Sequence, residues 1–154
     1  MDMSEMLKPG AVLPALKASN CKVAFQDVSA RLADLYGLPA RRICEALTAR
    51  EHLGSTGVGH GVAIPHARIA GLHQIGGLFA RLETPIPFEA ADGKNVDLMF
   101  VLLAPEDAGA DHLRALAKVS RLMRDGDLRA KLRQTITANA LHALLTEPSN
   151  ARAA

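Results

Sequence analysis

The feature that most constrains the fold is a nearly unbroken apolar run, VDLMFVLLA, at residues 96–104. A strand with one face in water alternates apolar and polar side chains, because successive side chains point to opposite faces of the sheet. This run does not alternate, so both faces of its strand are expected to be covered. Pro105 ends the run, since proline lacks the N–H that a central strand needs. The pattern predicts a central strand in a layered α/β domain.

Segments on either side of this run carry apolar residues at steps of three and four, which is the period of an amphipathic helix. The first such segment stops at Gly37, a residue that suits a helix C-terminus. Pro39 stands where the next helix could begin, because its fixed φ matches a first helical turn. The expected helices span residues 25–36, 39–50, 111–123, 128–134 and 139–145.

A second strand is expected at residues 75–83, where apolar and polar residues alternate. The sequence TPIPF at 84–88 predicts an irregular exit from it, and DGK at 92–94 indicates a turn. Helices that bracket short strands are typical of an α/β sandwich. The 154 residues contain no repeat or linker, so a single domain is expected over 1–154. Its core should cover about residues 7–146, and the small, polar tail at 147–154 should be flexible.

Composition excludes several classes of function. A formal net charge of +2 and few aromatic residues disfavour nucleic-acid binding, which needs a basic surface and rings for stacking. No apolar stretch is long enough to span a bilayer, so no direct membrane insertion is expected. Cys21 and Cys44 stand in no paired motif, and the N-terminus has no apolar signal segment. The expected location is the cytoplasm, with both thiols reduced.

The glycine-rich stretch GSTGVGHGVAIPHAR, at residues 54–68, is the candidate for chemistry. It lacks the lysine and hydroxyl of a Walker loop, and its evenly spaced glycines do not match a dinucleotide fingerprint. It also lacks the G-x-S-x-G of a nucleophile elbow. His52, His60 and His66 are spread out without a cysteine cluster, which disfavours a zinc site. Neither a metal nor a bound cofactor is expected.

Two interpretations of this stretch remain. A plain turn between a helix and a strand is the commoner use of such a composition. Alternatively, its N–H groups converge on an anion beside His66, which Pro65 holds in place. Arg50 would then supply positive charge for a phosphoryl group, and the ordered conjunction of these features favours this second reading. The expected phosphate-binding residues are Gly54, Ser55, Thr56, Gly57 and Gly59.

The segment REHLGSTGVGHGVAIPHA, at residues 50–67, resembles the active-site signature of the enzyme IIA proteins of the phosphotransferase system, fructose and mannitol superfamily. DGKNVDLMFVLLAP at 92–105 and DHLRALAKVSRLM at 111–123 extend the match. The chain most resembles the nitrogen-type branch. The resemblance implies a mixed β-sheet flanked by helices.

The resemblance also implies a phosphohistidine phosphocarrier and assigns three residues. His66 matches the phosphoryl acceptor, modified at the tele nitrogen Nε2, and His112 matches an assisting histidine. Arg50 matches the arginine that stabilises charge. An imidazole with a pKa of about 6.5 is largely a neutral nucleophile near neutral pH, which suits that chemistry. His112 is expected in the first turn of its helix, where free N–H groups and the helix dipole favour an anion.

The partners implied by the resemblance are proteins. The phosphate donor would be the phosphocarrier NPr or HPr, and the regulated targets would include potassium-transport proteins or sensor kinases. One alternative is a sugar-transport IIA that passes phosphate to a IIB domain. Another is a regulatory binding module that no longer accepts phosphate, although intact Arg50, His66 and His112 argue against it.

The sequence departs from the family pattern at two places. His60 stands where these proteins often have asparagine, and it is interpreted as a loop residue. Ala67 and Arg68 follow His66 where glycine and lysine are common, which predicts a stiffer loop and a slightly different partner surface. The remaining histidines, expected at solvated or packing positions, are His52, His73 and His142.

Overall fold

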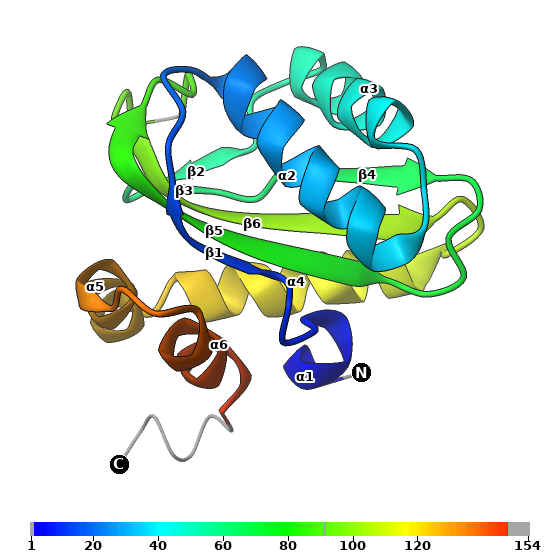
Figure 1. The fold of residues 1–154 in the computed structure, drawn as a ribbon. Coiled ribbons are helices and arrows are strands. Elements are labelled where there is room, and N and C mark those ends of the chain that lie inside the picture. Colours follow the sequence, from blue (N-terminus) through cyan, green and yellow to red (C-terminus); the bar gives the residue numbers. More distant parts are fainter. Residues whose placement is uncertain (1, 91, 148–154) are drawn as a thin grey trace.

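The computed structural model describes residues 2–90 and 92–147 and shows a three-layer sandwich of helices, sheet and helices (Figure 1). The strands are β1 Val12–Leu16, β2 Gly57–Gly59, β3 Val62–Ala63, β4 His66–Ile69, β5 Gly76–Ile86 and β6 Val96–Pro105. The helices are α1 Met3–Met6, α2 Cys21–Tyr36, α3 Ala40–His52, α4 Ala110–Met123, α5 Gly126–Gln134 and α6 Ala138–Thr146. This architecture confirms the predicted α/β sandwich.

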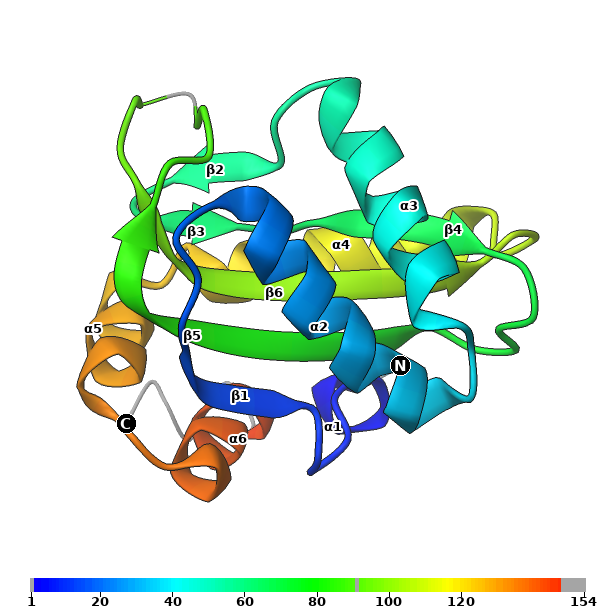
Figure 2. The same cartoon turned by 45° about the horizontal axis from the view of Figure 1, so that its top comes forward.

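β6 lies at the centre of a six-stranded sheet with the order β1-β5-β6-β3-β2, and β4 also pairs with β6. β5 runs antiparallel to β6, whereas β3 and β4 run parallel to it, so the sheet is mixed as expected. β1 and β2 lie at opposite edges (Figure 2). Nine of the ten residues of β6 are buried, which confirms the predicted central strand covered on both faces.

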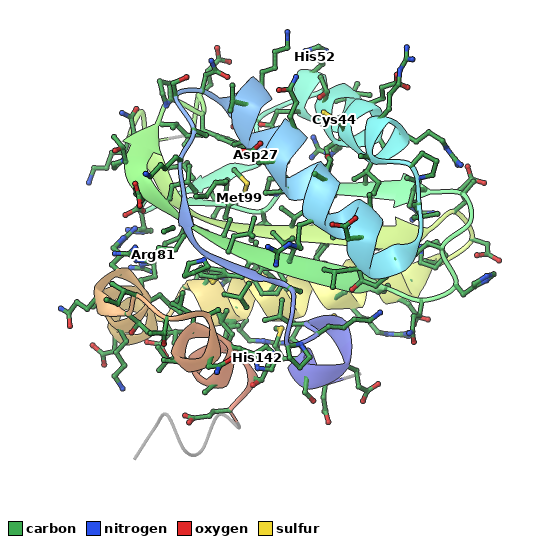
Figure 3. The ribbon with its side chains drawn as sticks, viewed as in Figure 1. Asp27, Cys44, His52, Arg81, Met99 and His142 are labelled. Atoms are coloured by element: carbon green, nitrogen blue, oxygen red, sulfur yellow. The ribbon has the colours of Figure 1, made fainter. Side chains whose placement is uncertain are left out.

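Alternate residues of β6 enter two separate hydrophobic cores. Phe100 and Leu102 pack in the core beneath α4, α5 and α6. Met99 and Val101 pack in the core beneath α2 and α3, and Figure 3 shows Met99 on that side of the sheet. Burying one such side chain stabilises the fold by roughly 1.5–3 kcal/mol. The unbroken apolar run therefore reflects helices on both faces of the sheet.

The helices that precede the glycine-rich stretch begin and end where local chemistry favours it. The side chain of Asn20 accepts a hydrogen bond from the N–H of Val23 and caps α2. Gly37 ends α2 with a φ of 68°, a left-handed conformation that glycine adopts without strain, so the predicted stop is confirmed. α3 begins directly after Pro39 and ends at His52, two residues later than expected. It carries Arg50 in its last turn.

The helices predicted after the central strand are also confirmed. α4 begins one residue before the expected start, at Ala110, and α5 and α6 cover the two shorter segments. All three pack on the same face of the sheet, where they contribute Val119, Leu132 and Leu141 to one core. α4 therefore starts close to where β6 ends and runs back beneath the sheet.

The predicted irregular exit at residues 84–88 was wrong for its first three residues. β5 continues to Ile86, which pairs again with Val96 of β6. The register shifts between Arg81 and Ile86, so the ladder is interrupted there. Such an interruption tolerates Pro85, which cannot donate a ladder hydrogen bond.

Four short elements, α1, β1, β2 and β4, were not predicted. β1 contains Pro14 and is a five-residue edge strand, so its pairing with β5 rather than its own pattern defines it. Met3 and Met6 of α1 are buried, so packing begins before residue 7. Of the tail expected to be flexible, residues 148–154 lie outside the described residues. Within the described part of the chain, no helix is long and apolar enough to cross a membrane.

Candidate active site

His66 is the first residue of β4, so a strand rather than a loop presents it. It pairs with Leu102 of β6, whose N–H donates to the carbonyl of Pro65 at 2.9 Å. The ring Nδ1 lies 2.8 Å from the carbonyl oxygen of Ile64. Because a carbonyl oxygen can only accept, Nδ1 carries the proton, and the neutral ring has its lone pair at Nε2.

His112 lies in the first turn of α4, as expected. Its ring stands edge-on to the ring of His66, with centroids 5.5 Å apart and an interplanar angle of 70°. His112 is only 7% exposed, and its buried Nε2 has no hydrogen-bond partner among the described residues. A buried polar atom without a partner is costly, so it suggests a site that a ligand completes. The N-cap residue Gly109 has no side chain to cap this helix start.

The surroundings keep both rings in the neutral form. Burial is the main reason that the pKa of His66 lies below its ordinary value. The positive charge of Arg50 lowers this pKa further, whereas the bonded carbonyl and the Glu51 carboxylate act in the opposite direction. The pKa of His112 is also lowered, first by burial and then by His66 and Arg68. Near neutral pH both imidazoles are therefore uncharged.

Two guanidinium groups lie in electrostatic reach of this pair. Arg50 donates from Nη1 to the carbonyl of Gly54 at 2.9 Å. Arg68 follows His66 by two residues on β4, so both side chains leave the same face of the strand. Its Nη1 contacts the carbonyl of Glu106 at 3.4 Å. Neither arginine has a carboxylate partner in the described part of the chain, so their charges favour an added anion.

The hydroxyl groups of the glycine-rich stretch are bonded inside the protein. Ser55 donates from Oγ to the carbonyl of Phe88 at 2.6 Å and accepts from the N–H of Gly57 at 3.1 Å. Thr56 donates through its N–H and its hydroxyl to the two carboxylate oxygens of Glu51. The expected donors thus have internal partners. A direct role in phosphate binding stays a prediction for Gly54, Ser55, Thr56, Gly57 and Gly59.

Part of the expected loop is a strand, because β2 pairs antiparallel with β3. A Cβ on Gly57 would lie 2.8 Å from the Cβ of Ala90, so glycine permits the close approach of a neighbouring segment. Gly59 has a φ of 94°, where a side chain would be strained. The local structure therefore explains why glycine occupies these two positions, which the sequence pattern did not reveal.

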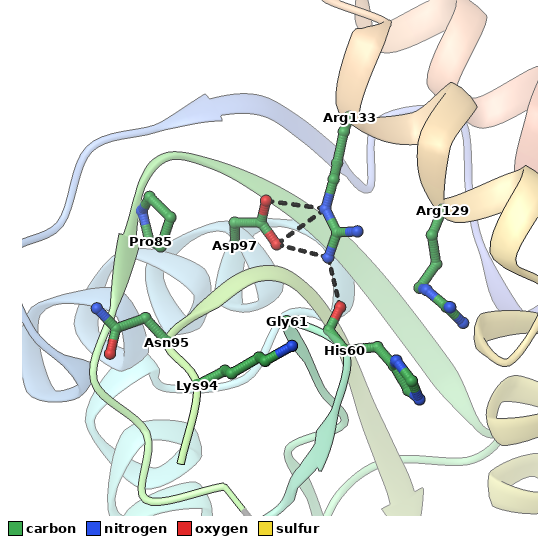
Figure 4. Close-up of a pocket in the computed structure, with 8 residues that line it drawn as sticks. All are labelled: His60, Gly61, Pro85, Lys94, Asn95, Asp97, Arg129 and Arg133. Carbon is green, nitrogen blue, oxygen red and sulfur yellow. Dashed lines mark hydrogen bonds and ion pairs between the residues drawn. The ribbon is translucent and has the colours of Figure 1, made fainter. Parts of the chain in front are cut away.

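A pocket of about 350 Å³ lies near the start of β6 (Figure 4). Its lining residues are His60, Gly61, Pro85, Lys94, Asn95, Asp97, Arg129 and Arg133. Arg133 binds the Asp97 carboxylate through Nε at 2.9 Å and Nη2 at 3.0 Å, and it also donates to the carbonyl of His60. The structure thus places His60 at this pocket, in the turn between β2 and β3. Because Asp97 matches the charge of Arg133, this pair holds α5 against the sheet.

The other histidines lie where the sequence predicted, at solvated or packing positions. His52 and His73 are exposed. His142 is half-buried, and its Nε2 lies 2.9 Å from the carbonyl of Leu7, which ties α6 to the N-terminal segment (Figure 3). No group of three or more histidine, cysteine or acidic side chains that could hold a metal occurs within residues 2–90 and 92–147.

Sequence comparison places these residues in a known context. Residues 5–147 match the family described as phosphoenolpyruvate-dependent sugar phosphotransferase system, EIIA 2. A nitrogen regulatory protein of Bradyrhizobium diazoefficiens is 51% identical over 148 residues, covering 96% of this chain and 97% of that protein. The similarity therefore spans both the fold and the candidate site.

Comparison with solved structures agrees. The crystal structure of the nitrogen regulatory protein IIA-Ntr from Neisseria meningitidis superposes with a TM-score of 0.88 at 38% identity, covering 94% of this chain and 99% of that one. The IIA mannitol protein of Escherichia coli superposes with a TM-score of 0.75 at 18% identity, covering 90% and 97% of the two chains. At that identity the second likeness concerns the fold alone.

Proposed function

Because the chain belongs to the EIIA type 2 family of the phosphotransferase system, among its nitrogen regulatory proteins, we propose that it is a phosphocarrier with His66 as the acceptor. One observation carries this proposal. The Nδ1 of His66 is taken by a backbone carbonyl, and the ring stands beside His112, whose buried Nε2 lacks a partner. Two neutral imidazoles, one nucleophilic and one able to donate, suit a phosphoryl group between them.

The transfer itself is a nucleophilic displacement at phosphorus. The Nε2 lone pair of His66 forms a new N–P bond while the N–P bond to the donor protein's histidine breaks, and that electron pair returns to the donor's imidazole. Negative charge on the transferred oxygens would be stabilised by His112, by the first turn of α4 and by Arg50 and Arg68. Alignment and charge stabilisation are the main demands of phosphoryl transfer.

The family implies partners that exchange phosphoryl groups, and we propose that the donor is the phosphocarrier NPr or HPr. The nitrogen regulatory relatives favour a regulatory protein whose binding to targets depends on phosphorylation. Such targets would be potassium-transport proteins or sensor kinases. Transfer onward to a IIB domain is the alternative outcome, and the cytoplasm is the proposed location because the donors act there.

The decisive experiment is intact-mass spectrometry at neutral to alkaline pH. The protein is incubated with phosphoenolpyruvate, enzyme I and HPr, or with the nitrogen-type counterparts, beside two variants. One added phosphate is expected on the wild type and on His73→Ala, which changes an exposed histidine away from the site. None is expected on His66→Ala. The same phosphate on His66→Ala, or none on the wild type with either donor, would contradict the proposal, and loss of the phosphate to an added IIB domain would indicate the sugar-transport alternative.

A further inference from the structure

The carboxylate of Glu51 accepts two hydrogen bonds although its position in the helix is unfavourable for a negative charge. Glu51 lies in the last turn of α3, where the helix dipole disfavours a negative charge. Both of its oxygens nevertheless accept hydrogen bonds from Thr56, at 2.8 Å from the N–H and 2.6 Å from the hydroxyl. Thr56 is only 5% exposed. Charge-assisted bonds of this kind are roughly twice as strong as neutral ones, so the pair is held firmly.

From Thr56 the hydrogen bonds continue to the acceptor histidine. The Thr56 carbonyl accepts from the N–H of Ile64 at 3.0 Å. The Ile64 carbonyl in turn accepts from Nδ1 of His66 at 2.8 Å. Four groups therefore form a single series, and its first member is anchored in α3 while its last is the reactive ring. Because Pro65 restricts the backbone between Ile64 and His66, a shift of Ile64 is transmitted to the ring.

The direction of the hydrogen bonds in this series determines which imidazole nitrogen of His66 carries the proton. A carbonyl at Nδ1 requires the proton on that nitrogen and leaves Nε2 with the lone pair. The Glu51 carboxylate also acts on the ring through space, opposing Arg50. Of these two influences, the hydrogen bond to the Ile64 carbonyl is the one that favours a ring donating from Nδ1. We propose that Glu51 and Thr56 are positioning residues that hold His66, through Ile64, in the tautomer and orientation whose Nε2 accepts the phosphoryl group.

This inference rests on the proposed function for its purpose, but its physical content can be measured without phosphate. Long-range ¹H–¹⁵N NMR of the imidazole nitrogens distinguishes a protonated Nδ1 from a protonated Nε2. In the wild type, His66 is expected to show the Nδ1–H form. In Thr56→Val, which keeps the size of the side chain but removes the hydroxyl, a mixture of the two forms is expected. Thr56→Ser restores the hydroxyl and should restore the wild-type spectrum.

Phosphorylation rates of the same variants complete the test. Thr56→Val and Glu51→Gln are expected to slow transfer by about tenfold, the size of losing one hydrogen bond to a charged group, and Thr56→Ser should not. Backbone amide spectra report whether each variant is folded. Unchanged tautomer populations in both Thr56→Val and Glu51→Gln would overturn the inference, whatever their rates. A shifted tautomer in a protein that never accepts phosphate would instead leave the inference standing and contradict the proposed function.

If Thr56→Val fails to fold, Glu51→Gln decides the matter alone, because it keeps the shape of the side chain and one accepting oxygen. A His66 spectrum identical to the wild type in that variant would overturn the role of the carboxylate. A measurable fraction of the Nε2–H form would support it. His73, exposed and outside the series, provides the internal control, since its tautomer signals should not change in any variant.

Discussion

Arginine side chains near the two ends of β6 have different kinds of hydrogen-bond partner. Near the start of the strand, the Arg133 guanidinium binds the Asp97 carboxylate through two nitrogens (Figure 4). Around His66, beside the end of the strand, Arg50 and Arg68 bond backbone carbonyls and have no carboxylate partner among the described residues. Arg133 and Asp97 thus form a charge pair, whereas the two guanidinium groups around His66 bond neutral carbonyls.

This difference separates a structural cluster from a reactive one. In a half-buried ion pair each charge has its partner, and removing one partner leaves the other charge poorly solvated and unpaired. Within the described part of the chain, the site around His66 has guanidinium groups without a carboxylate partner and a buried ring nitrogen without a hydrogen bond. A bound anion would therefore stabilise it. We therefore expect changes at the first cluster to reduce stability and changes at the second to reduce phosphoryl transfer.

The largest effect is expected for His66→Ala. The side chain is half-buried at the start of a strand, so its loss should leave the fold intact while phosphorylation falls to background. Mass spectrometry measures the phosphate, and amide spectra or circular dichroism measure the fold. An unfolded variant would mean that the site around His66 also stabilises the fold, contrary to the expected separation of structure and reactivity.

Arg50→Ala should slow transfer by roughly 100-fold, the lower end of what losing one charge-stabilising donor costs. Its hydrogen bond to the Gly54 carbonyl is exposed to solvent, so little change in stability is expected. Single-turnover transfer from the phosphorylated donor gives the rate, and titration with the unphosphorylated donor gives the affinity. Equal losses of rate and affinity would assign Arg50 to the docking surface instead.

Arg133→Ala should instead reduce the stability of the fold and leave the rate of phosphoryl transfer largely unchanged. It leaves the Asp97 carboxylate, whose side chain is only 23% exposed, without its partner, so unfolding should become easier by about 1–3 kcal/mol. The transfer rate of the folded fraction should stay close to the wild type. Denaturant titration and the phosphorylation assay test the two halves of this prediction. A large loss of rate in the fully folded variant would show that the pocket and the site are coupled.

Gly61→Ala is a smaller perturbation of the same cluster. The added Cβ would meet Arg133 Nη2 and Asp97 Oδ1, and the φ of 78° disfavours a side chain. We expect a loss of at least about 1 kcal/mol in the free energy of unfolding, which is the cost of the left-handed backbone strain alone. Gly93→Ala is the matched control, since it has a similar φ of 71° and nothing within 4 Å of the added atom. Equal losses in the two variants would show that backbone strain, rather than the ion pair, sets the cost.

The smallest expected effect is on the pH dependence of stability. The folded protein lowers the pKa of His66 and His112, so the unfolded chain binds protons more readily at these rings. Their contribution is fully present above the unfolded value of about 6.5 and is lost as the pH falls through the folded values. Denaturant titrations should therefore show a weaker loss of stability on acidification in the double variant His66→Ala, His112→Ala than in the wild type. Parallel curves would contradict the assigned neutral pair.

Local patterns were sufficient to predict most of the fold. The unbroken apolar run of β6, the helical periods and the signals at Gly37 and Pro39 act through neighbours in the chain, so one sequence reveals them. β1 is defined by pairing with β5, which is distant in the chain, and the sequence analysis missed it. The same cause explains the error at residues 84–88, since β5 resumes its pairing only because Val96 lies opposite Ile86.

The residues of the candidate site likewise divide into those that local sequence patterns predict and those that only the fold brings together. The motif around His66 and the helix start at His112 are readable in order along the chain, which is why a resemblance could be stated. Glu51 was missed because a carboxylate five residues before Thr56 follows no spacing rule, and only the folded chain shows the two bonds between them. The Asp97 and Arg133 pair was missed for a similar reason, since 36 residues separate its members.

The amino-acid order predicts which residues are apolar, where the helices stop and which histidine follows a proline, because these depend on the chemistry of single residues and their near neighbours. The folded chain was needed to show which charges are paired, which ring nitrogen is hydrogen-bonded and which has no partner. Those outcomes depend on contacts between distant segments, and hydrogen bonds and ion pairs act only over a few ångströms.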